Sequence, residues 1–503
     1  MSEFKINDIY NVNCLEMLQG LPDNSIDSLV TDPPYGMSKD DPKQMQEIIR
    51  QWANGNDDAT KLGKGFMGKE WDAFVPPPLI WKEIYRVLKP GAYGLVFSST
   101  RTQDLMSISL RFAGFQIKDV VEWLYFSGFP KSHNIGKAID KMDAKEERRK
   151  RNLEFTAFMR STGLTSKQIN DATGTNMAGH YLTDKEQPAV ATEDLFSKLR
   201  PLITTPIPAS IERLVKDRTV ESENTKKREV VGKNPNVSNG KAGWQDTGYV
   251  GGKVTGGDDQ ITTSHTPEAK KWDGWGTQLK PSHEPAILIQ KPISEKTIAD
   301  NVLKWGTGGL NIDETRIGEE EISVHNAPKG TFAGGEWDRG SETIYRTNTG
   351  RFPANSITED PDQFYSKYFN ITPKELSKKA GKKDRNADYL GNEIGLEEKV
   401  LEKEGPLRTA EKRETKKKNN HPTVKPVALM EHLIKMITPY DGVVMDPFLG
   451  SGSTIVAARR LAHFNEKYYK LNFIGSELSS EYFEICEARI FPEYKNNDQE
   501  GEK

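Results

Sequence analysis

Four consecutive residues near the N-terminus bring together groups that could hold a small planar molecule. Asp32-Pro33-Pro34-Tyr35 directly follows the apolar run 26–31, which is typical of a strand that enters a core. The carboxylate can accept a hydrogen bond, the prolines fix the direction of a backbone carbonyl, and the ring offers a flat face for stacking. This combination suits a planar exocyclic amine, such as the amino group of adenine or cytosine. An ordinary strand-ending turn has the same composition, so the motif needs support from the rest of the chain.

A second candidate site lies far along the chain, in residues 445–454. A strand runs there into a Gly-x-Gly turn and an Ala-rich helix, and Gly450 and Gly452 remove side chains where a ligand would approach the backbone. The N–H groups that begin the helix can bind an anionic group. Glu477 ends the next strand, where an acid can hydrogen-bond both hydroxyls of a ribose. We therefore expect a nucleoside-bearing cofactor here, with a plain strand–helix turn and a surface Glu as the alternative.

The glycine pattern narrows the type of cofactor. A dinucleotide-binding turn usually has a third glycine, but here Ile455 is followed by Val456. The pattern Asp-Pro-Phe-x-Gly-x-Gly over 446–452 instead favours S-adenosylmethionine, which has no phosphate and carries a methionine carboxylate and amine.

Strands and helices alternate at both ends of the chain, which predicts an α/β fold with a mostly parallel sheet. A helix over 79–88 is expected to stop at Lys89-Pro90-Gly91, where a tight turn would lead into the next strand. The expected strands are 26–31, 92–98, 117–126, 284–291, 443–445 and 473–475, and the other expected helices of these regions are 427–437, 453–462 and 479–490.

The composition excludes several classes of protein. With 503 residues the chain has room for about two to four domains. Its net charge of −3 gives no overall attraction to nucleic acid, so any such binding must come from a local basic face. No apolar run approaches the roughly 18 residues of a membrane span, and no Cys/His cluster has zinc spacing, so neither a membrane nor a metal is expected. Cys14 and Cys486 fit buried thiols in a reducing cytoplasm, which is the expected location.

Four segments resemble the amino-group DNA methyltransferases, which act on adenine N6 or cytosine N4. Thr31-Asp32-Pro33-Pro34-Tyr35 matches the family's catalytic motif, and 446–452 matches its cofactor loop. Gly475-Ser476-Glu477-Leu478 matches the segment with the ribose-binding acid, and His421-Pro422-Thr423-Val424-Lys425-Pro426 the segment before the cofactor strand. The catalytic motif comes first and the cofactor loop last, as in the permuted beta arrangement of the family.

The resemblance implies an α/β fold with a Rossmann-like, S-adenosylmethionine-dependent methyltransferase sheet that is mostly parallel, doubly wound and circularly permuted. The catalytic half would be 1–130 and the cofactor-binding half 419–503, with a return to the sheet at 276–320. The inserted regions 131–275 and 321–418, mainly helical or loop-like, would carry target recognition and linkers.

The resemblance also implies residues that hold the cofactor. Thr423 and Lys425 would lie near its methionine end, although Thr423 could instead cap a helix with Pro426 in its first turn. Asn13 stands where the family often has an acid that contacts the cofactor's adenine amine, and its amide oxygen can still accept that hydrogen bond. The remaining cofactor-binding residues are Asp446, Phe448, Gly450, Gly452, Ser453 and Glu477.

The implied reaction is methyl transfer to an exocyclic amine of a base that has left the stack of double-stranded DNA. Asp32 and the Pro33 carbonyl would each accept one amine hydrogen, Pro34 would fix the loop and Tyr35 would stack on the base, with no covalent intermediate and no metal. In the family, Asp at the first motif position favours adenine N6, with cytosine N4 as the alternative. An RNA or protein methyltransferase and an inactive DNA-binding scaffold are further alternatives. The motif order speaks against the former and the intact motifs against the latter.

A helix-turn-helix-like stretch at 164–182 is the candidate DNA-contacting insert, within 150–205. Thr165 could cap one short helix and Thr175 a second, with Gly174 between them. A helical hairpin that only packs against the catalytic domain is the alternative, and the loops at 240–275 and 326–360 compete as readers. The candidate DNA-binding residues are Arg148, Arg149, Lys167, Gln168 and Asn176. A homodimer and a restriction nuclease are protein partners that the sequence leaves open.

Overall fold

The chain forms two compact units in the computed structural model. We call them the sheet unit, which comprises Met1–Gly128 and Ser282–Lys503, and the inserted unit, which comprises Phe129–Pro281. The structure describes residues 4–37, 41–60, 72–125, 132–183, 187–216, 223–233, 237–238, 241–242, 260–324, 346–358, 370–371, 379–394 and 419–492. No helix in these ranges is both long and apolar enough to span a bilayer.

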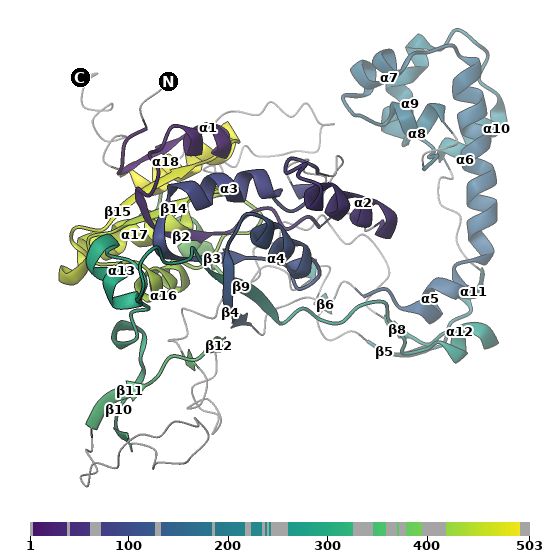
Figure 1. The fold of residues 1–503 in the computed structure, drawn as a ribbon. Coiled ribbons are helices and arrows are strands. Elements are labelled where there is room, and N and C mark those ends of the chain that lie inside the picture. The colour runs from purple at the N-terminus through teal and green to yellow at the C-terminus, as the bar shows by residue number, and fades with distance from the viewer. Residues whose placement is uncertain are drawn as a thin grey trace, which may run out of the picture. The chain divides into compact units, whose positions relative to one another are not determined.

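The sheet unit is built on a twisted sheet with the described strand order β1-β15-β14-β2-β3-β9-β4-β12-β13 (Figure 1). Neighbouring strands are parallel except β9, which runs antiparallel to both β3 and β4. The predicted α/β fold with a mostly parallel sheet is therefore confirmed. The strands are β1 Asp8–Tyr10, β2 Ile26–Thr31, β3 Leu88–Phe97, β4 Gln116–Leu124, β9 His283–Gln290, β12 Ser356–Thr358, β13 Asn370–Ile371, β14 Val443–Asp446 and β15 Asn472–Ser476.

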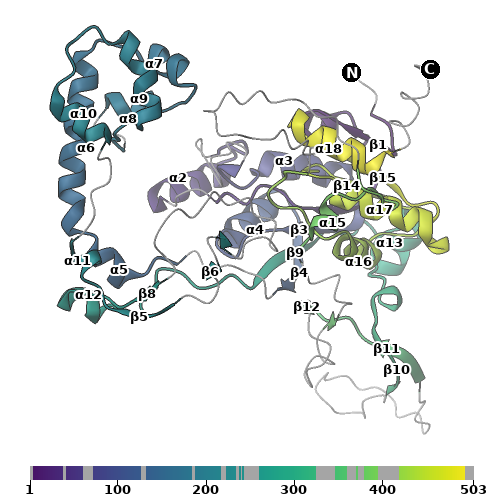
Figure 2. The same ribbon diagram turned by 180° about the vertical axis from the view of Figure 1, so that it is seen from behind.

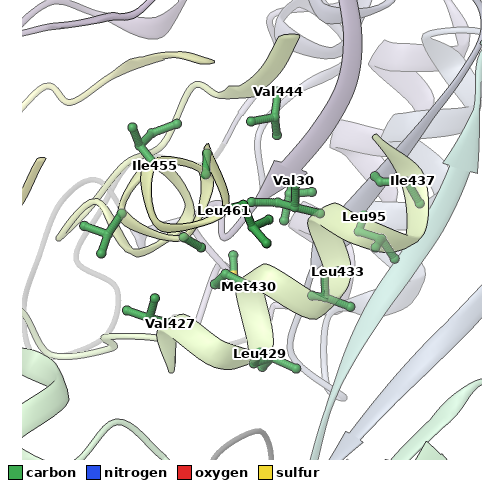
Figure 3. Packing of buried hydrophobic residues seen from close by; sticks show 14 of the residues in the cluster. Val30, Leu95, Val427, Leu429, Met430, Leu433, Ile437, Val444, Ile455 and Leu461 are labelled. Carbon is green, nitrogen blue, oxygen red and sulfur yellow. The ribbon is translucent and has the colours of Figure 1, made fainter. Parts of the chain in front are cut away.

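Helices cover both faces of the sheet, because successive residues of a buried strand point to opposite sides. Val30 and Leu95 belong to the core of α16 and α17 (Figure 3), whereas Leu29 and Val96 belong to a second core with α1, α3 and α4. The helices α16 and α17 are neighbours (Figure 2). The sheet is thus doubly wound, as predicted. The helices of this unit are α1 Cys14–Gln19, α2 Pro42–Ala53, α3 Pro78–Val87, α4 Gln103–Phe112, α13 Ile298–Trp305, α15 Lys382–Arg385, α16 Val427–Ile437, α17 Ser453–Phe464 and α18 Ser480–Ile490.

Strands β2 and β14 lie side by side, so the two halves of the predicted site meet. Ser28 and Leu29 pair with Val444 and Met445 in parallel register. At the ends of these strands the Thr31 hydroxyl donates a 2.7 Å hydrogen bond to Asp446 Oδ1, across 415 residues of sequence. Because parallel strands end at the same edge, both motifs emerge there.

One predicted boundary is wrong. Residues 89–91 do not form a tight turn but belong to β3, which begins at Leu88. The register against β2 shifts there, so that Leu88 faces Ile26 and Tyr93 faces Ser28. Gly91 has φ +82° at this bulge, and its N–H donates to the carbonyl of Lys291. The chain thus absorbs the expected turn as a β-bulge, because it pairs at once with its neighbours.

The inserted unit has a small hydrophobic core of its own. Phe155, Met159, Ile169, Tyr181 and Phe196 are among its fully buried members. The described helices are α5 Ile135–Asp140, α6 Asp143–Ser161, α7 Ser166–Thr173, α8 Ala178–Leu182, α9 Glu193–Leu199, α10 Ala209–Lys216, α11 Glu223–Lys226 and α12 Pro267–Lys271, and the described strands are β5 Val230–Lys233, β6 Val237–Ser238, β7 Lys241–Ala242 and β8 Gln260–Thr262. Three antiparallel pairs complete the described strands: β10 Ile317–Val324 with β11 Arg346–Arg351 in the sheet unit, and β5 with β8 and β6 with β7 here.

The helix-turn-helix-like stretch is only partly as predicted. Thr165 caps α7 in a capping box with Gln168, and Gly174 ends α7 in the left-handed conformation. Thr175 does not cap α8, because its hydroxyl pairs with that of Thr173. The Asn170 side chain instead accepts the Ala178 N–H at the start of α8. Of the competing loops, 243–259 and 325–345 lie outside the described residues, as does 395–418 of the predicted linker.

Candidate active site

The loop after β2, residues 32–36, is held by three hydrogen bonds to its backbone. Asp72 Oδ1 accepts the N–H groups of Tyr35 at 2.8 Å and of Gly36 at 3.0 Å, and the Thr102 hydroxyl donates to the Tyr35 carbonyl at 2.6 Å. Gly36 has φ +69°, and a Cβ there would lie 2.8 Å from the Val75 nitrogen. The loop therefore has one well-defined path, which fixes the direction of the Asp32 and Tyr35 side chains.

Lys425 joins this loop from the segment before α16. Its ammonium lies 2.5 Å from Asp32 Oδ2 and 3.0 Å from the Tyr35 hydroxyl, and that hydroxyl donates to Asp32 Oδ1 at 2.6 Å. The Lys425 side chain is only 5% exposed and its ammonium lies over the Phe97 ring. The structure thus brings Lys425 to the predicted catalytic carboxylate.

Glu284 completes the cluster, and sequence reasoning missed it. Its Oε2 lies 3.3 Å from both the Lys425 ammonium and the Tyr35 hydroxyl, and Lys379 lies 3.7 Å from its Oε1. Because β9 is antiparallel to β3, the start of β9 lies at the edge where the parallel strands end. An acid that directly precedes the apolar run 285–290 was a usable signal, but only with the direction of β9 known.

The two carboxyl groups of the cluster titrate differently. Burial raises the pKa of Asp32, and the Lys425 ammonium offsets this only in part, while the Glu284 charge adds to it. For Glu284, burial also favours the protonated form, but the ammonium groups of Lys425 and Lys379 outweigh it and lower its pKa. Asp32 is therefore the carboxylate of the pair that is protonated first as the pH falls.

The loop between β14 and α17, residues 446–453, is fastened to Glu477 at the end of β15. Glu477 accepts the N–H of Gly450 through Oε2 and that of Ser479 through Oε1, each at 2.8 Å. Gly450 and Gly452 have φ +56° and +76°, and a Cβ on Gly450 would lie 2.8 Å from His421 Nε2. Burial raises the pKa of Glu477 to about 7, although these N–H groups oppose it.

Asp446 and Phe448 line the start of the same loop. Asp446 Oδ1 accepts the Thr31 hydroxyl and, at 3.1 Å, the Phe448 N–H. Burial raises the pKa of Asp446 to about 6. The Phe448 ring lies 6.3 Å from that of Trp81, at the end of the second core.

Arg489 of α18 holds the loop 446–453 through hydrogen bonds to Ser451 and Ser453. Its guanidinium is fully buried and donates to the Ser451 carbonyl at 2.7 Å, to the Ser453 hydroxyl at 3.3 Å and to the carbonyls of Ala387 and Asp384. An arginine among the apolar positions of helix 479–490 was the only sequence signal for it.

Comparison with known proteins identifies the family. A family model for N6/N4 methylases, described as DNA methylase, matches residues 26–488. The chain belongs to this family. The type II methyltransferase M.ScaI of Streptomyces caespitosus is 35% identical over 79 residues, which are 16% of this chain and 23% of that protein. M2.DpnII of Streptococcus pneumoniae is 38% identical over 77 residues, which are 15% and 26%. The chain thus matches about a quarter of the length of these curated relatives.

Solved structures of DNA methylases also align with the chain. The PvuII DNA methyltransferase (cytosine-N4-specific) shares 12% identity, with 98% of this chain and 91% of that chain covered and a TM-score of 0.34. The M1.HpyAVI–SAM complex shares 14% identity, with 96% and 98% covered and a TM-score of 0.30. S-adenosylmethionine, the predicted cofactor, is the methyl donor of the DNA methylase family.

Two predicted cofactor residues of this DNA methylase have local roles. Asn13 is exposed and accepts the Leu15 N–H at 2.9 Å as the cap of α1, while Asn11 donates to the Glu477 carbonyl. Thr423 does not cap α16: Pro426 holds that position without a side-chain bond, and the Thr423 N–H points to His421 Nδ1 at 3.4 Å.

The predicted DNA-binding residues all lie in the inserted unit, which has its own hydrophobic core. The Asp32 cluster belongs to the sheet unit. They are exposed on α6, on α7 and in the turn before α8. The Gln168 amide oxygen accepts the Thr165 N–H at 2.9 Å, so the capping box occupies that side of the amide. The described members of this set are Arg148, Arg149, Lys167, Gln168 and Asn176.

Proposed function

We propose that the protein is a site-specific DNA methyltransferase that transfers a methyl group from S-adenosylmethionine to the exocyclic N6 of adenine in double-stranded DNA. The supporting observation is the pairing of β2 with β14, which brings the segment that carries Asp32 to the same sheet edge as the glycine loop that is bonded to Glu477. A base-holding acid and a nucleoside-holding acid at one sheet edge suit the transfer of a group between two nucleosides.

The residues of the loop 446–453 fit the methyl donor. Each Glu477 oxygen accepts one N–H and keeps acceptor capacity for a ribose hydroxyl. A Cβ on Gly450 would meet the His421 ring at 2.8 Å, so the loop can follow this left-handed path only without a side chain there. When bound, S-adenosylmethionine supplies an electrophilic methyl group on a sulfonium. The residues that would bind it are Asp446, Phe448, Gly450, Gly452, Ser453 and Glu477. Asn13 and Thr423 would contribute less.

The loop 32–36 would prepare the amine. An exocyclic amine is a poor nucleophile, because its lone pair is delocalised into the ring. Asp32 and the Pro33 carbonyl would accept hydrogen bonds from its two N–H groups and draw the nitrogen toward tetrahedral geometry, while Tyr35 would stack on the flipped base. As the new N–C bond forms, the nitrogen gives up one proton, and Asp32 is the carboxylate within reach of it.

Mapping of modified bases in DNA from a host that expresses the chain tests the proposal. We expect N6-methyladenine in one sequence context and none in a host without the chain. N4-methylcytosine in place of N6-methyladenine would show that the protein methylates cytosine N4. The absence of both modified bases would overturn the proposal. The same assay on a variant lacking 150–205 tests whether the inserted unit reads DNA: an unchanged context would exclude it as the reader.

Replacement of Gly450 by alanine is expected to weaken cofactor binding by roughly tenfold or more, because the methyl group meets the buried His421 ring and the left-handed backbone disfavours a side chain. Gly306→Ala is the matched control, since Gly306 has φ +75° with nothing within 4 Å of its Cβ position. Isothermal titration calorimetry compares the two variants. Equal cofactor affinities in both variants would show that the backbone at Gly450 does not contribute to cofactor binding.

Cofactor affinity is expected to fall as the pH drops from 8 to 6. The pKa of Glu477 is raised to about 7, so this carboxyl loses its charge in that range, and only the charged form accepts hydrogen bonds with all its lone pairs. The loss approaches about tenfold per pH unit below the pKa. Calorimetry across this range checks it, and Glu477→Gln should bind weakly with the carboxylate-dependent slope removed. A wild-type slope that survives in Glu477→Gln would assign the titration to another group.

A further inference from the structure

The Asp32 carboxylate is engaged on both of its oxygens by protein donors. Oδ1 accepts the Tyr35 hydroxyl at 2.6 Å and Oδ2 accepts the Lys425 ammonium at 2.5 Å. These short, charge-assisted bonds compete with an amine hydrogen for the charge of the carboxylate. Each oxygen still has a lone pair for an amine hydrogen, but the two protein donors orient the carboxylate and take up much of its negative charge. Asp32 would therefore bind the amine more strongly if these donors had a second acceptor.

Glu284 is the one described carboxylate that both donors reach besides Asp32. Its Oε2 lies 3.3 Å from the Tyr35 hydroxyl and 3.3 Å from the Lys425 ammonium. A small movement of these two donors would therefore transfer their hydrogen bonds from Asp32 to Glu284. Lys379 lies at the other oxygen of Glu284 and helps to keep it charged. A buried ammonium needs a carboxylate partner at every stage, because an unpaired buried charge is costly.

We propose that Glu284 is a positioning residue for methyl transfer: it takes over the Lys425 ammonium and the Tyr35 hydroxyl when Asp32 turns to the amine of the target base. This inference rests on the proposed function. Glu284, at the start of β9, would weaken the hold of the protein donors on Asp32 while Lys425 stays paired with a carboxylate.

The charges around Glu284 give the exchange a measurable signature. The groups that face it are Asp32, Tyr35 and Lys425 at the cluster, Lys379 beside it, and Tyr125, whose hydroxyl bonds to Glu284. The Glu284 charge raises the pKa of Asp32, and removing it leaves Lys425 to Asp32 alone. The carboxylate of Asp32 would then persist to lower pH but would be held more tightly by its protein donors.

The test is Glu284→Gln in single-turnover methyl transfer at saturating cofactor and DNA. We expect the plateau rate to fall about 10- to 100-fold, as for a lost positioning group, and the acid limb of the pH–rate profile to move to lower pH, with cofactor affinity unchanged. Glu295→Gln is the matched control, because Glu295 is also paired with a lysine, Lys304 at 2.6 Å, but on the surface. It should behave as wild type.

Lys379→Met gives an independent second measurement. Lys379 is 47% exposed, so its replacement leaves the core intact, and removal of its charge should move the acid limb slightly to higher pH, opposite to Glu284→Gln. An unshifted limb in Glu284→Gln, a wild-type rate in that variant, or a downward shift in Lys379→Met would each overturn the inference. If the wild-type protein itself methylates no DNA amine, the proposed function fails instead, so the two failures are distinguishable.

Discussion

Replacement of Asp32 by asparagine is expected to lower the rate of methyl transfer by about 100- to 1,000-fold or more, the usual effect of removing a preorganised hydrogen-bonding group at the reacting atom. The amide keeps the size of the carboxylate but loses the charge that pairs with Lys425 and half of the accepting capacity. Transfer of a tritiated methyl group to duplex DNA in a single turnover measures the effect.

Cofactor binding should survive in this variant, because the described contacts of Asp32 are with Tyr35 and Lys425 rather than with the loop 446–453. Asp23→Asn is a suitable control, since Asp23 precedes the same strand and forms an exposed ion pair with Arg86. Methyl transfer at the wild-type rate by Asp32→Asn would remove Asp32 from the chemistry. Lost cofactor binding would make it structural.

Replacement of Arg489 by methionine is expected to destabilise the sheet unit by about 3–5 kcal/mol, because several buried acceptors lose a charged donor at about 1–3 kcal/mol each. Methionine fills much of the volume but leaves the carbonyls of Ser451, Ala387 and Asp384 buried without the donor that they have now. Because Ser451 and Ser453 belong to the loop 446–453, which we propose to hold the cofactor, cofactor affinity should fall as well. Denaturant unfolding measures the first effect and calorimetry the second.

Arg50→Met is the matched control for this variant. Arg50 lies on α2 with an exposed side chain that bonds to Glu47, so its loss should leave the unfolding midpoint unchanged. Stability equal to wild type in Arg489→Met would mean that water replaces the guanidinium, and the proposed bracing of the loop would then be wrong.

Most of the elements of the sheet unit could be predicted from local patterns. Strand β2, helix α16 and the turn into α17 each carry their signal within a few residues, as an apolar run, a helical spacing or a glycine pair. The exceptions arise where distant neighbours decide the local path. Residues 89–91 look like a helix stop and turn, yet they belong to β3, where the register against β2 shifts and the Gly91 N–H donates to the Lys291 carbonyl. At the start of α8 the Asn170 side chain, and not Thr175, accepts the Ala178 N–H.

The sequence by itself determined the residue types of the proposed site: a carboxylate after one strand, and a glycine loop and an acid after two others. Only the tertiary structure decided that these groups share one edge, because the pairing of β2 with β14 joins residues more than 400 positions apart. It also decided that Lys425 and Glu284 face Asp32. Strand order and direction are long-range properties, and β9 brings Glu284 to the site only because it runs against its neighbours. No local pattern encodes that direction, so the second carboxylate was visible in the structure alone.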